Sequence, residues 1–423
     1  MTKTNRLALW AGASLIALSG AAAANTTIDM YYPIAVGGPL TQVIDGYVAQ
    51  FMEQNPDITV NAIYSGSYID TTTKALTTAK GGNPPALAVL LATDIFTLLD
   101  EDVIAPIDSF VTTAEDQAWL DGFMPAYMAS ATVDDHVWGI PFQRSTAVMY
   151  WNKDAFAEVG LDPETPPTTW DELRDYAEKL TTGDGSRYGI GIPGNNGSNQ
   201  WMFGAMTAQN DVRLMNNDGT ETYLTDPRVV ETLQYWVDLE RAGIHPPGIL
   251  EWGTTAQSFM DGQLAMIWST TGNLTNLRNN ATINFGLAPM PGNPNPASVL
   301  GGGNLYIFSD APEDQQKAAF ELIKFMTSDE ILADWGIQTG YVAPRDGSWD
   351  TPELQAYVAE VPAAEVARKQ IPVSVPEWST YENGRTTRVL NDAVAAALTG
   401  QKTAEQALTD AQAELDRILR PYR

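Results

Sequence analysis

The chain contains no cysteine and only two histidines among its 423 residues. Without cysteine it forms no disulfides and has no thiolate metal ligand and no cysteine nucleophile. Because His136 and His245 are the only histidines, the chain has too few imidazole groups to favour a histidine-based zinc site or a serine–histidine triad. His245 precedes two prolines, a setting typical of a solvated loop side chain. The sequence therefore predicts neither a metal nor a cofactor.

Basic residues are also scarce. Lysine and arginine number 24 against 52 aspartates and glutamates, which gives a formal net charge of −28. Such a balance argues against nucleic acid and against anionic membrane surfaces as partners. It indicates solvated acidic faces suited to a saline habitat, with an electrostatic role in docking as the alternative reading. An anionic ligand would need a locally positive pocket.

Long apolar runs are missing except near the start. Lys3 and Arg6 precede the apolar segment Leu7–Leu18, and three alanines ending at Ala24 offer a small-residue cleavage site. This pattern predicts a secretory signal peptide over residues 1–24. Because no cysteine follows the cleavage site, we expect free release into a periplasm without a lipid anchor. The remaining length, roughly 400 residues, predicts two or three domains.

Short β-type runs alternate with amphipathic helices along the chain. In the first part we expect strands at Thr26–Tyr32, Ile58–Tyr64 and Ala86–Leu91, and helices at Leu40–Phe51 and Thr71–Ala79. Later we expect strands at Ala147–Trp151 and Tyr188–Ile192, and helices at Pro227–Ala242, Thr254–Met260 and Glu313–Thr327. The alternation predicts an α/β fold whose sheets are covered on both faces.

One stretch, from Ser145 to Leu173, is especially informative: STAVMYWNKDAFAEVGLDPETPPTTWDEL. Asn152 can cap a short helix that ends at Gly160. After a proline-rich turn, Thr169 and Glu172 have the spacing of a capping box for a second helix. The stretch therefore predicts strand, helix, turn and helix.

The wording of this stretch resembles a signature of the extracellular solute-binding proteins that serve carbohydrate-type ABC importers. Two further regions carry the same resemblance. One is FMDGQLAMIWST at 259–270; the other combines GGGNLYIF at 301–308 with WGIQTGYVAPR at 335–345. Since the phrases occur in the family's order across most of the chain, they are more specific together than singly.

The resemblance implies a two-lobed periplasmic-binding-protein fold of type II, with three hinge crossings and the ligand in the cleft between the lobes. We expect crossings near Gln143–Thr146, near Trp268–Gly272 and near the helix after Pro312. The expected first lobe comprises 25–143 and 272–325, and the second comprises 144–271 and 326–423.

Within the family, the chain is similar to the subgroup that binds glycerol 3-phosphate and glycerophosphodiesters, on YWNKDAFAEVGLDPETPPTTW, TGY and TGQKT. The phosphate-binding positions of that subgroup correspond to Ser145, Thr270, Gly302, Tyr341 and Arg388, with Arg385 as the alternative to Arg388. Hydroxyls, a backbone N–H at glycine and an arginine fork are donors that suit phosphate oxygens.

The glycerol end departs from the subgroup. Tyr68 matches a ligand tyrosine, but Ala92 occupies the position of a glutamate, and Asp94 is the nearest substitute. Trp201 stands one residue out of register with a ligand tryptophan, and Arg144 adds positive charge at the hinge. Trp268 is a further candidate that, like Trp252, either contacts ligand or packs within a lobe.

The resemblance implies a periplasmic substrate-binding component of an ABC importer and not an enzyme. It would capture a small organophosphate, of the glycerol 3-phosphate or glycerophosphodiester type, or a sugar-type solute by lobe closure. It would then deliver this ligand, as a monomer, to the permease's transmembrane subunits. The departures leave open a neutral, sulfonated or acidic sugar or oligosaccharide. A secreted glycoside hydrolase that uses two carboxylates is the remote alternative, and turnover of ligand would distinguish it.

Overall fold

The computed structural model describes residues 25–194 and 199–423, so the expected signal peptide lies outside the described residues. The first part of the chain forms an α/β series. Its elements are β1 (Thr26–Tyr32), α1 (Leu40–Gln54), β2 (Ile58–Tyr64), α2 (Tyr68–Lys80), β3 (Leu87–Leu91), α3 (Ile95–Asp100), α4 (Ala114–Asp121), α5 (Pro125–Met128), β4 (Thr132–Val133) and β5 (His136–Val137). The three strands expected here from alternation are thus present with nearly the expected bounds.

The remaining elements begin with a long strand and end with two long helices. They are β6 (Ile140–Asn152), α6 (Lys153–Glu158), α7 (Trp170–Leu180), α8 (Asn199–Gln209), α9 (Pro227–Arg241), α10 (Trp252–Met260), β7 (Met266–Thr270), α11 (Leu274–Asn280), β8 (Phe285–Ala288), β9 (Ser298–Ile307), α12 (Glu313–Met326), α13 (Asp329–Thr339), α14 (Asp346–Trp349), α15 (Pro352–Glu360), α16 (Glu365–Gln370), β10 (Ser374–Val375), α17 (Asn383–Leu398) and α18 (Ala404–Leu419).

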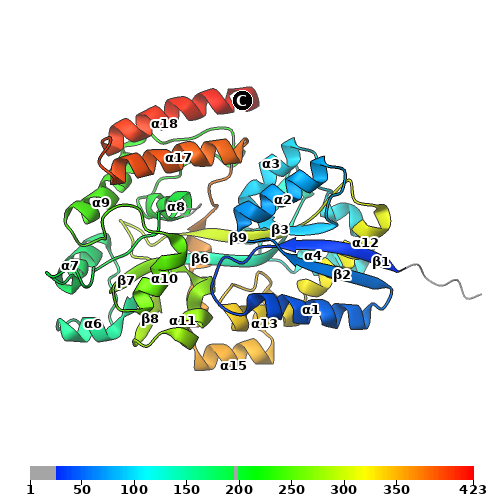
Figure 1. The fold of residues 1–423 in the computed structure, drawn as a ribbon, viewed down its shortest axis with the longest axis horizontal. Coiled ribbons are helices and arrows are strands. Elements are labelled where there is room, and N and C mark those ends of the chain that lie inside the picture. Colours follow the sequence, from blue (N-terminus) through cyan, green and yellow to red (C-terminus); the bar gives the residue numbers. More distant parts are fainter. Residues whose placement is uncertain (1–24, 195–198) are drawn as a thin grey trace, which may run out of the picture.

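One mixed sheet runs through the whole molecule in the order β2-β1-β3-β9-β6-β7, and β8 also pairs with β6. Figure 1 shows β6 and β9 side by side across the middle, with helices around both ends. The two strands are antiparallel, with Arg144 opposite Gly302 and Ser145 opposite Gly301. Because both strands extend into each half, they form a continuous connection between the two lobes.

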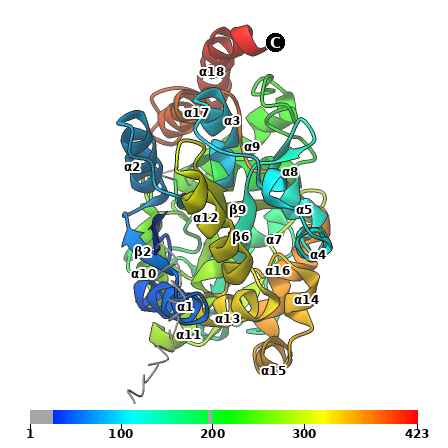
Figure 2. The same cartoon turned by 90° about the vertical axis from the view of Figure 1, so that its right-hand side faces the viewer.

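The first lobe buries both faces of its strands. Met30, Val89 and Ile307 belong to a core cluster packed against α1, α12 and α13, whereas their neighbours Tyr31 and Leu90 face a smaller cluster packed against α2 and α3. Successive strand residues point to opposite faces, so these apolar runs fill two helical layers. Figure 2 looks onto this lobe, with α1, α2 and α12 arranged around the strands.

The second lobe repeats this arrangement on the other half of β6. Met149 and Trp268 enter a large cluster with α7, α8, α9, α17 and α18, while Val148, Tyr150 and Ile267 face a cluster with α10 and α11. All thirteen residues of β6 are buried. The expected strand Ala147–Trp151 is the second-lobe half of β6, and the longer observed strand is part of the core of both lobes.

The chain connects the two core clusters through β6, β9 and the segment after α16 that leads to α17. The expected crossing at Gln143–Thr146 lies in β6. The other two expected crossings are misplaced, because Trp268 packs inside the second lobe and α12 inside the first. The second connection is made instead by β9, which contains the glycine run 301–303 and pairs with β6.

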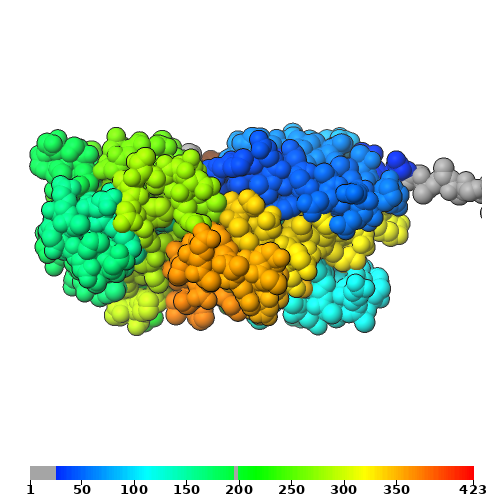
Figure 3. Space-filling view, turned by 90° about the horizontal axis from the view of Figure 1, so that it is seen from below, coloured from blue at the N-terminus to red at the C-terminus, as the bar shows by residue number. Residues whose placement is uncertain are grey.

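Helix α15 lies under the junction of the lobes. Its Tyr357 packs against clusters of both lobes, and Val361 follows it into the second. Seen from below, the orange segment that contains α15 covers this junction (Figure 3). The helices α13 and α14 pack in the first-lobe cluster, which favours a lobe boundary later than 325, whereas α15 and α16 contact clusters of both lobes.

Expectations about single residues and short segments were only partly confirmed. The Asn152 side chain caps α6 by accepting from the Ala155 N–H at 3.0 Å, as expected. Thr169 caps α7, but the Glu172 carboxylate bonds the N–H of Thr168 at 2.8 Å, one residue before a capping box requires. The expected strand at 188–192 makes only isolated bridges in the described chain, from Tyr188 to Leu264 just before β7 and from Gly191 to Ile267 within β7.

His245 is the clearest local correction. The side chain expected in solvent is 1% exposed, and its Nε2 accepts from the Ile192 N–H at 3.1 Å. Burial lowers the pKa of His245 to about 4. The loop is held inside the second lobe by this contact, which joins segments that are distant in sequence.

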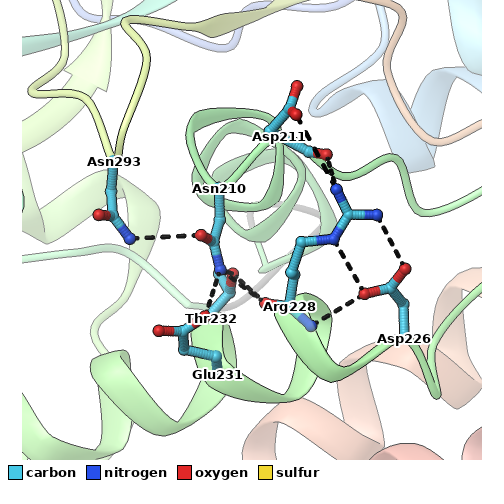
Figure 4. A network of polar contacts seen from close by, with 7 residues as sticks. All are labelled: Asn210, Asp211, Asp226, Arg228, Glu231, Thr232 and Asn293. Carbon is cyan, nitrogen blue, oxygen red and sulfur yellow. Dashed lines mark hydrogen bonds and ion pairs between the residues drawn. The ribbon is translucent and has the colours of Figure 1, made fainter.

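A polar network joins the end of α8 to the start of α9 in the second lobe (Figure 4). The buried Asn210 donates to the Arg228 carbonyl at 2.9 Å and to the Glu231 carboxylate at 3.1 Å. Arg228 in turn binds the Asp226 carboxylate at 3.0 Å. Since Asp226 also caps α9, the network fixes where this helix begins.

Across the described ranges, no helix is both long enough and apolar enough to cross a bilayer.

Candidate functional site

A cavity of about 620 Å³ lies between the lobes, and we call it the Tyr68 cavity. Six of the ten expected ligand residues line it. They come from both lobes and from the connecting strands: Tyr68 on α2, Ser145 on β6, Trp201 on α8, Thr270 on β7, Gly302 on β9 and Tyr341 after α13. The structure thus brings together residues that are far apart in sequence.

Tyr341 is placed by the end of α13. Gly340 ends the helix with φ 102°, and a Cβ there would lie 2.4 Å from the Thr271 carbonyl oxygen. Glycine therefore lets the helix end approach the second lobe closely. The Tyr341 ring stacks on Trp335 with centroids 5.8 Å apart, which fixes its direction into the cavity. Burial raises the pKa of Tyr341 to about 12, so its hydroxyl is a neutral donor.

Gly302 lets the two long strands approach each other. Its φ is 105°, and a Cβ would lie 1.8 Å from the Gln143 carbonyl oxygen. No side chain fits at that distance. The Gln143 side chain accepts from the Tyr68 hydroxyl at 2.7 Å. This bond joins the first-lobe wall of the cavity to β6.

Two tryptophans form the second-lobe wall. Trp201 and Trp252 meet edge to face with centroids 5.7 Å apart. The Trp201 ring nitrogen donates to the Leu300 carbonyl at 3.2 Å, and that of Trp252 donates to the Ala35 carbonyl at 3.1 Å. Since Ala35 belongs to the first lobe, the Trp252 contact joins the lobes directly. Among the described residues no lysine or arginine lines this cavity.

A second cavity of about 590 Å³ adjoins the lobe junction, and we call it the Arg144 cavity. Ala92 and Arg144 line it from the first-lobe side, and Arg213 lines it from the second lobe. Arg144 and Ser145 are consecutive residues of β6 that line different cavities. Neighbouring strand residues project to opposite faces, which accounts for this division.

Arg144 is 1% exposed and is held by three neutral acceptors. It donates to the Gly302 carbonyl at 3.2 Å, to Asn304 Oδ1 at 3.1 Å and to the Ser130 hydroxyl at 3.2 Å. Burial lowers the pKa of Arg144, although an arginine stays charged in proteins. Its Nε is buried without a partner.

Glu377 lines both cavities. Its side chain is half-buried, and Oε2 is out of reach of solvent with no hydrogen-bond partner. Burial raises the pKa of Glu377 to about 8, while Arg144 opposes this rise and Asp94 adds to it. The carboxyl group is therefore mostly uncharged at neutral pH.

Three expected residues lie outside both cavities. Trp268 is fully buried in the second-lobe core. Asp94 accepts from the Thr72 hydroxyl at 2.8 Å and from the Asn383 amide at 3.5 Å, and burial raises its pKa to about 6. Arg388 is exposed on α17, and the alternative Arg385 is also exposed and pairs with Glu382 at 3.3 Å. In this conformation the expected anion fork does not reach the cavities.

Sequence reasoning missed Glu377 altogether and left Trp252 undecided between ligand contact and packing. Glu377 follows Pro376 in a segment without helical or strand periodicity, so only its place between the prolines and α17 hints at a crossing. In the described part of the chain, no group of three or more histidine, aspartate or glutamate side chains is placed to hold a metal ion.

Comparisons with known proteins agree with this architecture. Residues 46–363 match the family model described as bacterial extracellular solute-binding protein. The sn-glycerol-3-phosphate-binding periplasmic protein UgpB of Escherichia coli K12 is 27% identical over 427 residues, covering 96% of this chain and 95% of that protein. The corresponding protein of Salmonella typhimurium is 27% identical with the same coverage.

Solved structures with the same fold bind several kinds of solute. UgpB from Mycobacterium tuberculosis in complex with glycerophosphocholine has a TM-score of 0.83 at 22% identity, covering 94% of this chain and 99% of that one. A Thermotoga lettingae ABC solute-binding protein with α-D-tagatose also scores 0.83, at 21% identity, covering 93% and 100%. Maltose-bound MalE3 of T. maritima scores 0.82 at 23% identity, covering 93% and 100%. At these identities the likeness shows the fold.

Proposed function

The chain belongs to the bacterial extracellular solute-binding proteins, and on this premise we propose that it captures a small, hydroxyl-bearing solute for an ABC importer. The solute is a glycerophosphate ester or a sugar. The observation that carries the proposal is the Tyr68 cavity, to which both lobes and both connecting strands contribute. A ligand that touches all of these walls stabilises the closed arrangement of the lobes.

The wall chemistry supports a hydroxyl-bearing solute. Ser145, Thr270 and Tyr341 bring hydroxyl groups that can donate and accept, the Tyr68 hydroxyl that donates to Gln143 can still accept, and the tryptophans bring apolar faces. These are the contacts that a sugar ring or a glycerol moiety uses. The names of the relatives, which bind glycerol 3-phosphate or glycerophosphocholine, support the phosphate ester.

The positive charge that could balance a phosphate group lies in the adjoining Arg144 cavity. Arg144 and Arg213 line the Arg144 cavity, whereas the described wall of the Tyr68 cavity contains hydroxyls and no cation. A charged ester therefore depends on the Arg144 side of the junction or on movement of Arg388, and a neutral sugar depends on neither.

A thermal-shift screen of the mature chain tests the proposal. The probes are sn-glycerol 3-phosphate, glycerophosphocholine, maltose and tagatose. We expect at least one probe to raise the melting temperature by several degrees at saturating concentration. The bound probe should be recovered unchanged after prolonged incubation. If none shifts the melting temperature, these two solute classes are wrong; if a probe is cleaved, the hydrolase alternative replaces solute binding.

The remaining aspects of the proposal concern export and assembly. The relatives' names place them in the periplasm, and we propose the same location for this chain after cleavage near Ala24. N-terminal sequencing of the exported protein tests the cleavage site. We also propose that a monomer delivers its ligand to the transmembrane subunits of the permease. Gel filtration tests the monomer, and ligand-dependent stimulation of a reconstituted importer's ATPase tests the delivery.

A further inference from the structure

Phe96 on α3 is a buried aromatic residue that belongs to the core of neither lobe. Its side chain is 7% exposed, yet it is part of none of the four apolar clusters of the described chain. Leu98, two residues later and on the opposite side of the helix, enters the smaller first-lobe cluster. Phe96 therefore projects away from the lobe to which its helix belongs.

The ring of Phe96 contacts the second lobe. Its centroid lies 4.9 Å from that of the Tyr381 ring. A Cβ on Gly219 would lie 2.8 Å from Phe96 Cε2, so the ring rests against a backbone that carries no side chain. Gly219 and Tyr381 are joined to each other, because the Tyr381 N–H donates to the Gly219 carbonyl at 3.1 Å. We call Phe96, Gly219 and Tyr381 the Phe96 clasp.

The Gly219 and Tyr381 half of the clasp is anchored in the second lobe. Gly219 follows Met215 and Tyr381 follows Trp378, and both of these earlier residues belong to the large second-lobe cluster. The Tyr422 ring stacks on Tyr381 with centroids 4.4 Å apart. The socket is thus part of one lobe, whereas the ring that fills it is part of the other.

We propose that Phe96 is a positioning residue for solute capture, because the Phe96 clasp holds the lobes together in the arrangement of this structure, even without ligand. Its effect on affinity rests on the proposed function, whereas its effect on the lobes requires no ligand. Separation of the lobes would expose the Phe96 ring, which is unfavourable. Affinity scales with the fraction of molecules in the binding-competent arrangement, so the clasp should raise it by the same factor for every solute that closure retains.

Distance measurements on the ligand-free chain test the clasp directly. Since the chain has no cysteine of its own, spin labels attach only to engineered cysteines. Thr77→Cys on α2 and Thr409→Cys on α18 are exposed positions in different lobes. The otherwise wild-type chain should show a closed population with a short distance between the labels. Gly219→Ala should lower the ratio of closed to open molecules about tenfold or more, because its Cβ meets the Phe96 ring.

Gly243→Ala is the matched control for Gly219→Ala. Both glycines belong to the second lobe, neither lines the described wall of a cavity, and their φ values are 65° and 71°. No described neighbour lies within 4 Å of a Cβ on Gly243. Both variants place alanine at a positive φ, so a difference between them reports the contact of the new Cβ. Gly243→Ala should leave the closed population unchanged.

A double variant assigns the effect to the Phe96 ring. Phe96→Ala alone should open the lobes as Gly219→Ala does. Phe96→Ala combined with Gly219→Ala should open them no further than Phe96→Ala alone, because the ring that the new Cβ would meet is then absent.

Calorimetry with each probe that binds in the thermal-shift screen tests the consequence for capture. Phe96→Ala and Gly219→Ala should weaken all such probes by one common factor of about ten to a hundred, and Phe96→Leu should recover part of the loss. Phe51→Leu is the control for a buried phenylalanine, because Phe51 lies in the first-lobe core outside both cavities. It should lower the urea midpoint but change affinity less than about twofold.

The outcomes separate this inference from the proposed function. A ligand-free chain without a closed population, equal populations in Gly219→Ala and Gly243→Ala, or additive losses in the double variant overturn the inference. If Phe96→Ala weakens one class of probe and Gly219→Ala weakens none, Phe96 contacts the ligand and is not a positioning residue. If no probe binds, the proposed solute classes are wrong, and the distances between the labels still decide whether the clasp holds the lobes.

Discussion

The Tyr68 cavity and the Arg144 cavity are similar in volume and share Glu377, but their walls differ in chemistry. The Tyr68 cavity presents hydroxyls and two tryptophans, and the family phrases contain Ser145, Thr270, Gly302 and Tyr341 from its wall. The Arg144 cavity presents charged side chains, Arg144 and Arg213, that those phrases do not specify. The difference separates a wall that is rich in hydroxyls and has no cation among the described residues from a wall that carries two arginines.

The two sides of β6 are the origin of this difference. Ser145 and Arg144 are neighbours, so one residue step changes the cavity that a side chain lines. Gly302 stands opposite Arg144 on β9 and belongs to the wall of the Tyr68 cavity. Both cavities therefore depend on the close approach of β6 to β9.

Gly302→Ala should break both cavities together and produce the largest effect. The added Cβ would lie 1.8 Å from the Gln143 carbonyl oxygen at a φ of 105°, so the strands must separate. We expect the free energy of unfolding to fall by about 3 kcal/mol or more, measured by urea denaturation. Gly46→Ala in α1 is the control, because no atom lies within 4 Å of its Cβ. It should stabilise the chain by up to about 1 kcal/mol. Similar effects of both changes would contradict this account.

Arg144→Met should destabilise the wall of the Arg144 cavity and leave the wall of the Tyr68 cavity intact. The variant removes a buried charge but leaves the Gly302 carbonyl and Asn304 without their donor. We expect a loss of about 2 to 3 kcal/mol in unfolding free energy. Arg213→Met is matched to it, since Arg213 lines the same cavity but is exposed, and it should change stability by less than about 0.5 kcal/mol. If both variants are equally stable, Arg144 is not a structural part of the wall.

The shared carboxyl group should make stability depend on pH. Burial on folding raises the pKa of Glu377 from its ordinary value of 4.5 to about 8, so between these values the folded state holds a proton that the unfolded state has released. Stability contributed by this group is present below about pH 4.5 and is lost as pH rises through about 8. The unfolding free energy of wild type relative to Glu377→Gln should therefore fall by about 1 to 3 kcal/mol over this range. A constant difference would show that Glu377 ionises normally in the folded chain, and a difference that rises with pH would show that folding lowers its pKa.

The fold was predictable where burial follows a local period. The strands β1, β2 and β3 alternate between two core clusters, and their bounds agree closely with those expected from the sequence. The buried position of His245 was not predictable, because it depends on Ile192, which is 53 residues away in the chain. The second and third crossings were misplaced for the same reason: pairing of β9 with β6 decides them, and no local pattern does.

The candidate site shows the same division. Residues within local phrases, such as Ser145 and Tyr341, were found by resemblance and lie together in one cavity. Glu377 belongs to no phrase, and it reaches the cavities only because the segment after α16 returns between the lobes. Its unpaired oxygen is a property of the assembled structure.

Ser145→Ala should weaken ligand binding in the Tyr68 cavity without affecting the fold. The hydroxyl lines the Tyr68 cavity, and its loss should weaken a bound probe about tenfold, which corresponds to one hydrogen bond of about 1 to 2 kcal/mol. Ser379→Ala is the comparison, since that hydroxyl lines the Arg144 cavity and already donates to the Thr93 carbonyl at 2.9 Å. It should leave affinity within about twofold. Calorimetry with the probe that binds best decides whether Ser145 is a ligand contact.

Arg388→Ala should have the smallest effect. Resemblance assigns this residue to an anion fork, but its side chain is exposed on α17 and lines neither cavity. Because an exposed arginine without a cavity contact contributes little, we expect unfolding free energy to change by less than about 0.5 kcal/mol. The thermal shift caused by the bound probe should also persist. If Arg388→Ala instead abolishes that shift for sn-glycerol 3-phosphate but not for maltose, lobe closure brings the arginine to the phosphate. The positive charge of Arg388 would then belong to the wall of the Tyr68 cavity. The two cavities would therefore differ less in charge in the closed state than they do here.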